Sequence, residues 1–118
     1  MGRLAMGKLE AVIMEILWNQ HEPLTPGQVH ALLVEQHSVA YSTVLTILIR
    51  LWNKGRLERR KEGRAFTYWP SIGRQEYIAA RMEEVLAAAS NRPEALGYFV
   101  GALTPADQER LRKILGEN

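Results

Sequence analysis

Two consecutive stretches decide the fold: AYSTVLTILIRLWNKG at residues 40–55 and RLERRKEGRAFTYWP at residues 56–70. On a helical wheel that turns by about 100° per residue, four apolar side chains of the first stretch converge on one side: Val44, Ile47, Leu48 and Leu51. Five polar side chains fall within an arc of about 100° on the opposite side: Ser42, Thr43, Thr46, Arg50 and Asn53. We therefore expect a helix that is buried over most of its surface, with Leu45, Ile49 and Trp52 filling the flank and a narrow polar stripe exposed.

The second stretch changes from helical to alternating periodicity. Gly55 predicts a left-handed cap that ends the helix. From Arg56 the residues alternate as in a strand, and the β-prone segment 65–69 predicts a return strand that ends at Pro70. Glu62-Gly63 between them is a hairpin signal, although a weaker one than Asn-Gly. The helix is thus followed by a two-stranded wing.

Basic charge is concentrated in this part of the chain. Residues 41–70 carry seven basic and two acidic side chains, whereas residues 1–40 have a net charge of −2 and residues 71–118 of −1. The net charge of +2 for the whole chain therefore hides a basic centre, to which a polyanion would be drawn. The alternatives are a solvated surface rich in arginine, or a charged ribbon that resists edge-to-edge aggregation.

The polar stripe has residue types that suit the edges of DNA bases. Short Ser and Thr hydroxyls allow close approach in a major groove, Thr methyls can touch a thymine methyl, and Arg can fork onto guanine. An ordinary exposed face usually carries Glu and Lys, and this stripe has neither. Four side chains surround the expected tip of the wing, where they could meet phosphates or enter a minor groove: Arg59, Arg60, Lys61 and Arg64. Together these features predict a winged helix-turn-helix that binds duplex DNA.

The residues before this stretch predict the rest of the winged domain. A first helix at about residues 7–19 follows from apolar residues at helical spacing, with Trp18 closing their side: Leu9, Val12, Ile13, Ile16 and Leu17. Thr25-Pro26-Gly27-Gln28 predicts a capping box that opens a second helix at about residues 26–35, which buries Val29, Leu32 and Leu33. Residues 37–39 then form the turn. We expect this domain to cover residues 1–71.

Residues 72–118 predict a helical dimerisation region. A stripe on a helix at about residues 73–90 comprises Ile78, Met82, Val85, Leu86 and Ala89; a weaker apolar segment contains Leu96, Phe99, Val100 and Leu103. Thr104-Pro105 then caps a last helix with Leu111, Ile114 and Leu115. Such helices cannot close a core without packing on the winged domain or on a partner chain, and we favour the partner chain. The expected dimer interface comprises Ile78, Met82, Val85, Leu86, Phe99, Leu111 and Leu115.

Composition argues against several other classes of protein. The absence of cysteine excludes disulfides and thiolate metal sites, and His21, His30 and His37 lack the spacing of metal ligands along a shared helix face. We expect no catalytic residues, metal or cofactor.

Neither a bilayer-length apolar run nor a secretory signal is visible, which predicts a cytoplasmic protein without membrane insertion. The chief alternative function is a winged-helix module that docks on protein without specific DNA binding.

Five motifs resemble those of the penicillinase and methicillin-resistance repressor family: MGKLE at residues 6–10, YSTVLT at 41–46, Arg50-Leu51, Lys54-Gly55, and GRAFTY at 63–68. The resemblance is specific over residues 4–70 and extends to residues 72–118 only in their helical character. It implies a mainly helical winged-helix repressor that binds a dyad-symmetric operator as a homodimer and controls beta-lactam resistance or a related stress response. The DNA contacts would come from Ser42, Thr43, Thr46 and Arg50, and in our reading also from Lys54, Arg60 and Arg64.

Two departures from the family concern induction. Some relatives sense copper through a Cys-x-Cys pair, and this chain has no cysteine. Others are cut at an Asn-Phe bond under the control of a membrane sensor protease, whereas Asn91 here precedes Arg92 and Phe99 follows Tyr98. The inducing signal, the sensor protease as a partner and the operator sequence are therefore left open. If induction is proteolytic, we expect the cut within residues 91–103, which Pro93, Gly97 and Gly101 punctuate.

Overall fold

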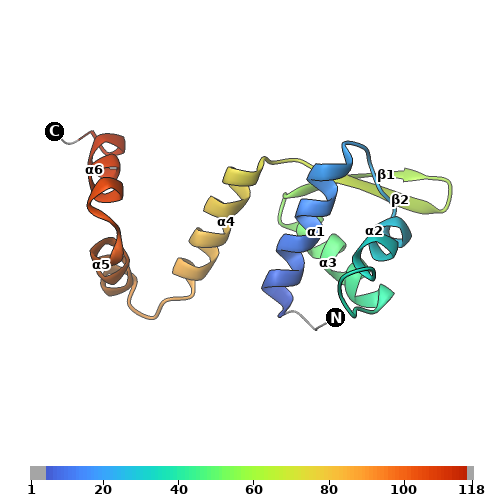
Figure 1. Ribbon diagram of the computed structural model, residues 1–118, viewed down its shortest axis with the longest axis horizontal. Helices are drawn as coiled ribbons and strands as arrows, with labels where there is room; N and C mark the ends of the chain where they lie inside the picture. Colours follow the sequence, from blue (N-terminus) through green and yellow to red (C-terminus); the bar gives the residue numbers. More distant parts are fainter. Residues whose placement is uncertain (1–4, 117–118) are drawn as a thin grey trace. The chain divides into compact units, whose positions relative to one another are not determined.

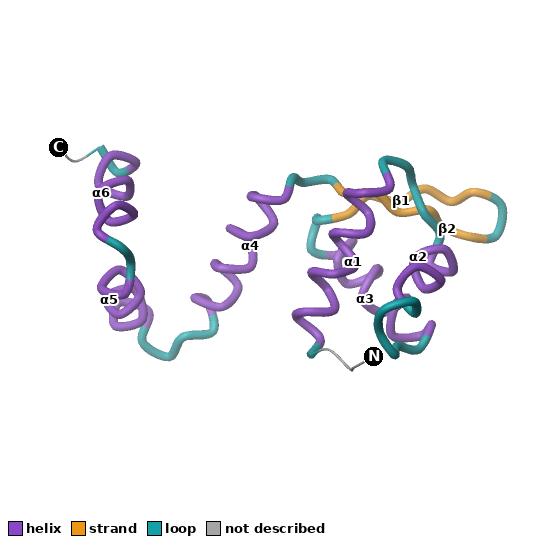
Figure 2. Tube along the Cα trace, viewed as in Figure 1, coloured by secondary structure: helices purple, strands orange, loops and turns teal. Residues whose placement is uncertain are grey.

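The structure, a computed structural model, describes residues 5–116 of the 118-residue chain. It is mainly helical with one two-stranded antiparallel hairpin, as the sequence predicts (Figures 1 and 2). The elements in chain order are α1 (Met6–Gln20), α2 (Pro26–Leu33), α3 (Tyr41–Asn53), β1 (Leu57–Glu62), β2 (Ala65–Pro70), α4 (Arg74–Ala87), α5 (Arg92–Ala102) and α6 (Pro105–Ile114). The chain divides into two compact units, one up to Arg74 and one from Gln75 onward.

Helix α1 buries a slightly different face from the one expected. Leu9, Ile13 and Leu17 are buried as predicted, but Glu10 and Met14 are buried beside them. Val12 and Ile16, which were expected on this face, are only half-buried. The buried side of α1 thus includes one carboxylate, whose partners are described with the interface.

Helix α2 begins at the predicted capping box. The Thr25 hydroxyl accepts a hydrogen bond from the Gln28 backbone N–H at 3.2 Å, and the Gln28 side-chain oxygen accepts one from the Thr25 N–H at 2.8 Å. Two otherwise unpaired amide donors at the helix start are thereby satisfied. The helix ends at Leu33, two residues before the expected end, and residues 34–40 lead into α3.

Helix α3 supplies the centre of the first unit's core. All four residues predicted for its apolar side are fully buried: Val44, Ile47, Leu48 and Leu51. The helix packs on α2, where Val29 and Leu33 are also fully buried, and on β1. Gly55 has a φ of 78° and ends the turn after α3, as the sequence predicts.

The wing is a regular hairpin that is anchored near its base. Its register runs from Leu57 opposite Pro70 to Glu62 opposite Ala65, and Gly63 takes a φ of 66° at the first position of the two-residue loop. Both favoured two-residue hairpin turns need a positive φ there. Leu24, which precedes α2, pairs with Tyr68 through two backbone hydrogen bonds of 2.8 and 3.0 Å. This bridge holds the inner part of the wing against the helices.

The first unit extends to Arg74, three residues beyond the boundary expected from the sequence. The Trp18 indole N–H donates to the Ile72 carbonyl at 3.0 Å, and the Arg74 guanidinium donates to Glu15 at 2.8 Å and to Asn19 at 2.9 Å. The hydrogen bond to Glu15 raises the pKa of Arg74 above its usual value. Residues 72–74 are therefore fastened to α1.

Helices α4, α5 and α6 have little buried surface, and side chains cap the last two. Asn91 caps α5 by accepting from the Glu94 N–H at 3.1 Å, and Thr104 caps α6 by accepting from the Asp107 N–H at 3.1 Å. Neither α5 nor α6 contains a buried residue. Among the residues the structure describes, no helix combines the length and apolar character needed to cross a bilayer.

Candidate nucleic-acid interface

The polar stripe of α3 is exposed. Ser42, Thr46 and Arg50 are exposed and Thr43 is half-buried, on the side opposite the four core residues of this helix. The Thr46 hydroxyl donates to the Ser42 carbonyl at 2.9 Å. Its oxygen can still accept a hydrogen bond, and its methyl can make an apolar contact. The helix contains no acidic residue, so its exposed side would not repel a polyanion.

The exposed side of α3 is broader and more apolar than expected. The sequence places Ile49 and Trp52 on a filled flank, but each keeps 37% of its surface exposed. The expectation was wrong because α3 packs on α2 and β1, and the Arg59 side chain of β1 covers only part of Trp52. Ile49 lies about 60° from Thr46 on the helical wheel and so borders the polar stripe. Sequence reasoning therefore missed the exposure of Ile49 beside the polar stripe.

Two basic side chains that follow α3 form ion pairs with Glu10 of α1. Arg56 Nη1 lies 3.5 Å from Glu10 Oε1, and Lys54 Nζ lies 3.7 Å from Glu10 Oε2. The Arg56 side chain is almost fully buried, whereas that of Lys54 is 31% exposed. Arg56 thus adds to the basic count of the segment but belongs to the interior. Lys54 remains partly accessible.

The arginines of the wing differ in their surroundings: two are exposed, and one lies against aromatic rings. Arg60 and Arg64 are exposed, and Arg60 Nη2 lies 2.8 Å from Glu62 Oε1. Arg59, expected near the tip, instead lies opposite Tyr68 in the middle of the hairpin. Its guanidinium carbon is 3.6 Å from the centroid of the Trp52 ring and 4.0 Å from that of Phe66. The Trp52 contact joins α3 to the wing within one compact unit.

The histidines have structural surroundings. His30 Nε2 lies 2.9 Å from the Val39 carbonyl oxygen, and the His30 ring meets Tyr41 edge-on with the centroids 6.0 Å apart. His21 takes the left-handed conformation that ends α1. Over residues 5–116 no three His, Asp or Glu side chains gather in a way that could hold a metal ion.

A family model described as "Penicillinase repressor" matches residues 6–117. The chain belongs to the penicillinase repressor family. It is 37% identical over 115 residues to the transcriptional regulator BlaI of Mycobacterium tuberculosis, a match that covers 95% of this chain and 83% of that protein. The penicillinase repressor of Bacillus licheniformis is 32% identical over 77 residues, which cover 65% of this chain and 59% of that one.

Two solved structures of BlaI repressors resemble part of this chain. The DNA-binding domain of the repressor BlaI has a TM-score of 0.52 at 34% identity, over 58% of this chain and 82% of that one. The monomeric form of Bacillus licheniformis BlaI in complex with the blaP half-operator has a TM-score of 0.50 at 30% identity, over 65% and 94%. The predicted family and the winged-helix fold are thus confirmed. The protein is a DNA-binding transcriptional repressor and not an enzyme.

Proposed function

We propose that this repressor acts in the cytoplasm as a homodimer that binds a dyad-symmetric operator through α3 and the wing. The observation that carries the proposal is the acid-free exposed side of α3, with Ser42, Thr46 and Arg50, adjoining a wing with exposed arginines. The related Bacillus licheniformis repressor was solved on a half-operator, which supports the same kind of target here.

The interface residues divide by role. Ser42, Thr43, Thr46 and Arg50 would face base edges, because hydroxyls and a forked guanidinium match the donors and acceptors of the major groove. Arg60 and Arg64 would contact the DNA backbone and set the register of the protein on the duplex. Lys54 would also contact a phosphate, since an ammonium group has three donors and can face Glu10 with one of them.

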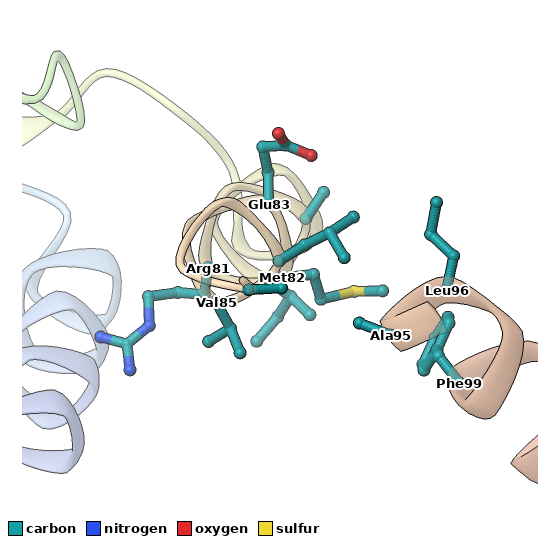
Figure 3. A pocket seen from close by; sticks show the side chains of 11 residues that line it. Arg81, Met82, Glu83, Val85, Ala95, Leu96 and Phe99 are labelled. Atoms are coloured by element: carbon teal, nitrogen blue, oxygen red, sulfur yellow. The ribbon is translucent and has the colours of Figure 1, made fainter. Parts of the chain in front are cut away.

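The homodimer rests on an apolar groove in the second unit. Residues of α4 and α5 line a cavity of about 790 Å³, among them Ile78, Met82, Val85, Leu86, Leu96 and Phe99 (Figure 3). Ile78, Met82, Val85 and Phe99 are exposed in the single chain. Leu111 of α6 and Leu115, which follows the end of that helix, do not line the groove; Leu115 is exposed and Leu111 half-buried. A second copy of this region would remove this apolar surface from water, which favours association.

Dimerisation also supplies the selectivity that one module lacks. A single recognition helix reads only a few base pairs, too little to select one site among the roughly 10⁶ or more competing positions of a genome. When two modules are joined, the second one binds at an effective concentration near millimolar. The two half-sites would then lie about one helical turn, or a multiple of it, apart.

The relatives support a proposal about the regulated genes and the inducing route. One relative is a penicillinase repressor, which supports control of beta-lactam resistance or a related stress response. A membrane sensor protease could trigger cleavage of this chain within residues 91–103. Since this stretch is the capped helix α5, a cut there would first require local opening of the helix.

The proposal is tested by footprinting the full chain on the DNA upstream of its own gene, and by measuring affinity against salt. A protected palindrome, with affinity that falls steeply as salt rises, is the expected result. The second candidate function is docking on another protein, for which the exposed Ile49 and Trp52 would supply apolar contacts. It would leave no palindrome protected, and partner binding through these apolar side chains would change little with salt.

A further inference from the structure

Arg59 of β1 makes three side-chain contacts, one with α3 and two with the neighbouring strand β2. Its guanidinium carbon lies 3.6 Å from the Trp52 ring centroid of α3 and 4.0 Å from the Phe66 ring centroid of β2. Its Nη1 donates to the hydroxyl of Tyr68, which is itself buried, at 3.4 Å. The positive charge of Arg59 is therefore directed at aromatic rings of its own chain.

Arg59 lies level with the backbone bridge, but its side chain also reaches Phe66, which is farther toward the loop. Leu24 holds β2 at Tyr68, and Phe66 lies two residues farther toward the loop. Arg60 and Arg64 belong to this outer part. The Arg59 guanidinium lies within 4.0 Å of both the Trp52 and the Phe66 ring centroids and so links α3 to the outer part of the hairpin, which would restrict the direction in which the two arginines point.

We propose that Arg59 is a positioning residue that fixes the wing on α3 and thereby places Arg60 and Arg64 against the DNA backbone. The inference rests on the proposed function and adds a residue that acts without touching DNA. An arginine suits this role because its planar, weakly hydrated guanidinium stacks on aromatic faces. The ammonium of lysine is compact and strongly hydrated, and would keep the charge but lose the stacking.

The main test is a charge-conserving substitution. The full chain and its Arg59→Lys variant would be titrated with a duplex that carries one half-site, so that dimerisation does not contribute, over a range of salt concentrations. Arg92→Lys is the matched control, since it removes the same planar group from an exposed ion pair with Glu83 in the second unit. We expect Arg59→Lys to weaken binding and to reduce the slope of log K against log salt by about one, although net charge is unchanged. The control should keep the wild-type slope.

A double-mutant cycle with Arg64→Ala separates positioning from direct contact. If Arg59 acts through the wing, the double variant should bind more tightly than the product of the two single losses predicts, by at least about twofold. Two results together would overturn the proposal: affinity losses of the single variants that simply multiply in the double variant, and a slope of log K against log salt that Arg59→Lys leaves unchanged. They would show that Arg59 itself contacts a phosphate. A lower melting temperature with unchanged affinity and slope would show a purely structural role and overturn it equally.

Hydrogen exchange in the free protein tests the clamp independently of DNA. Amides in residues 60–67 should exchange faster in Arg59→Lys than in wild type or Arg92→Lys, while amides of α1 should be unaffected. If the wild-type protein failed to bind DNA, the proposed function would fail, but this measurement would still report whether Arg59 restrains the wing. Unchanged exchange in residues 60–67 would refute the restraint itself.

Discussion

Glu10 and Arg56 form an ion pair in the interior of the first unit, with Arg56 Nη1 3.5 Å from Glu10 Oε1 and with only 8% and 4% of the Arg56 and Glu10 side chains exposed. The second oxygen of Glu10 lies 3.7 Å from Lys54 Nζ. One carboxylate of α1 thus holds both the end of α3 and the start of the wing. The contact therefore links α1 to the two elements that carry the proposed DNA-contacting residues.

Breaking the pair should destabilise the first unit strongly. Glu10→Gln leaves the buried Arg56 without its carboxylate, and we expect the free energy of unfolding to fall by about 3–5 kcal/mol. Replacing both partners, as Glu10→Leu with Arg56→Met, should cost much less, because no buried charge is then left unpaired. Urea unfolding followed by tryptophan fluorescence measures this, since Trp18, Trp52 and Trp69 all belong to the first unit.

Arg110→Ala is the control for that experiment, because it breaks an exposed pair with Asp107 in the second unit. Its effect on the same transition should stay below about 1 kcal/mol. If Glu10→Gln were as mild as this control, the buried pair would not organise the unit.

Base recognition by α3 should depend on Arg50 and Thr46. Arg50→Ala and Thr46→Ala should leave the fold intact, because both side chains are exposed. A forked Arg contact contributes about 1–3 kcal/mol of base discrimination, so specific affinity should fall roughly tenfold or more while affinity for random DNA changes little. Parallel titrations on operator and random duplexes decide this. An equal loss on both duplexes would identify Arg50 as a phosphate contact.

The exposed wing arginines should act on all sequences alike. Arg60→Ala or Arg64→Ala should weaken operator and random DNA similarly and reduce the slope of log K against log salt by about one for each lost phosphate contact and subunit. Glu62→Gln should change DNA affinity in the opposite direction. It removes the carboxylate 2.8 Å from Arg60 and should strengthen binding. A slope that stays constant in every variant would mean that the wing charges serve only to keep the exposed hairpin soluble.

Removing the second unit should separate folding from dimerisation. A chain that ends after Arg74 should fold, sediment as a monomer and bind the full operator at least about two orders of magnitude more weakly than the intact protein, because the second half-site no longer binds intramolecularly. A chain that ends at Ser71 should be less stable than one ending at Arg74, since it loses the Trp18 contact to Ile72 and the Arg74 contacts to Glu15 and Asn19. A monomer that binds the palindrome as tightly as the full chain would disprove the dimer argument.

Proteolytic induction, if this repressor uses it, should be limited by the opening of α5. The Asn91 side chain caps that helix, and its replacement by Ala should weaken the cap by about 1 kcal/mol. Limited proteolysis should then cut Asn91→Ala faster than wild type, at bonds within residues 91–103, while cuts elsewhere keep their rates. Recovery of the intact chain from induced cells, with DNA binding abolished by a small molecule, would instead indicate a ligand-controlled repressor.

Local patterns were sufficient to predict most elements of the fold and the polar stripe. The capping box at Thr25, the left-handed Gly55 and the core side of α3 each depend on residues within about one helical turn, so a short window of sequence contains the necessary information. The same holds for the cap of α6 at Thr104. These features were expected from the sequence and are found in the structure.

The roles of the charged residues were decided by the tertiary structure. Sequence counted Arg56 and Arg59 with the other cations of the basic segment, yet one pairs with Glu10 in the interior and the other lies against Trp52 and Phe66. Glu10 lies 46 residues from Arg56 along the chain, so no local periodicity reports their contact. Which side of a helix is covered, and which charge is buried, depends on how distant elements pack, and packing free energy is a property of the assembled core.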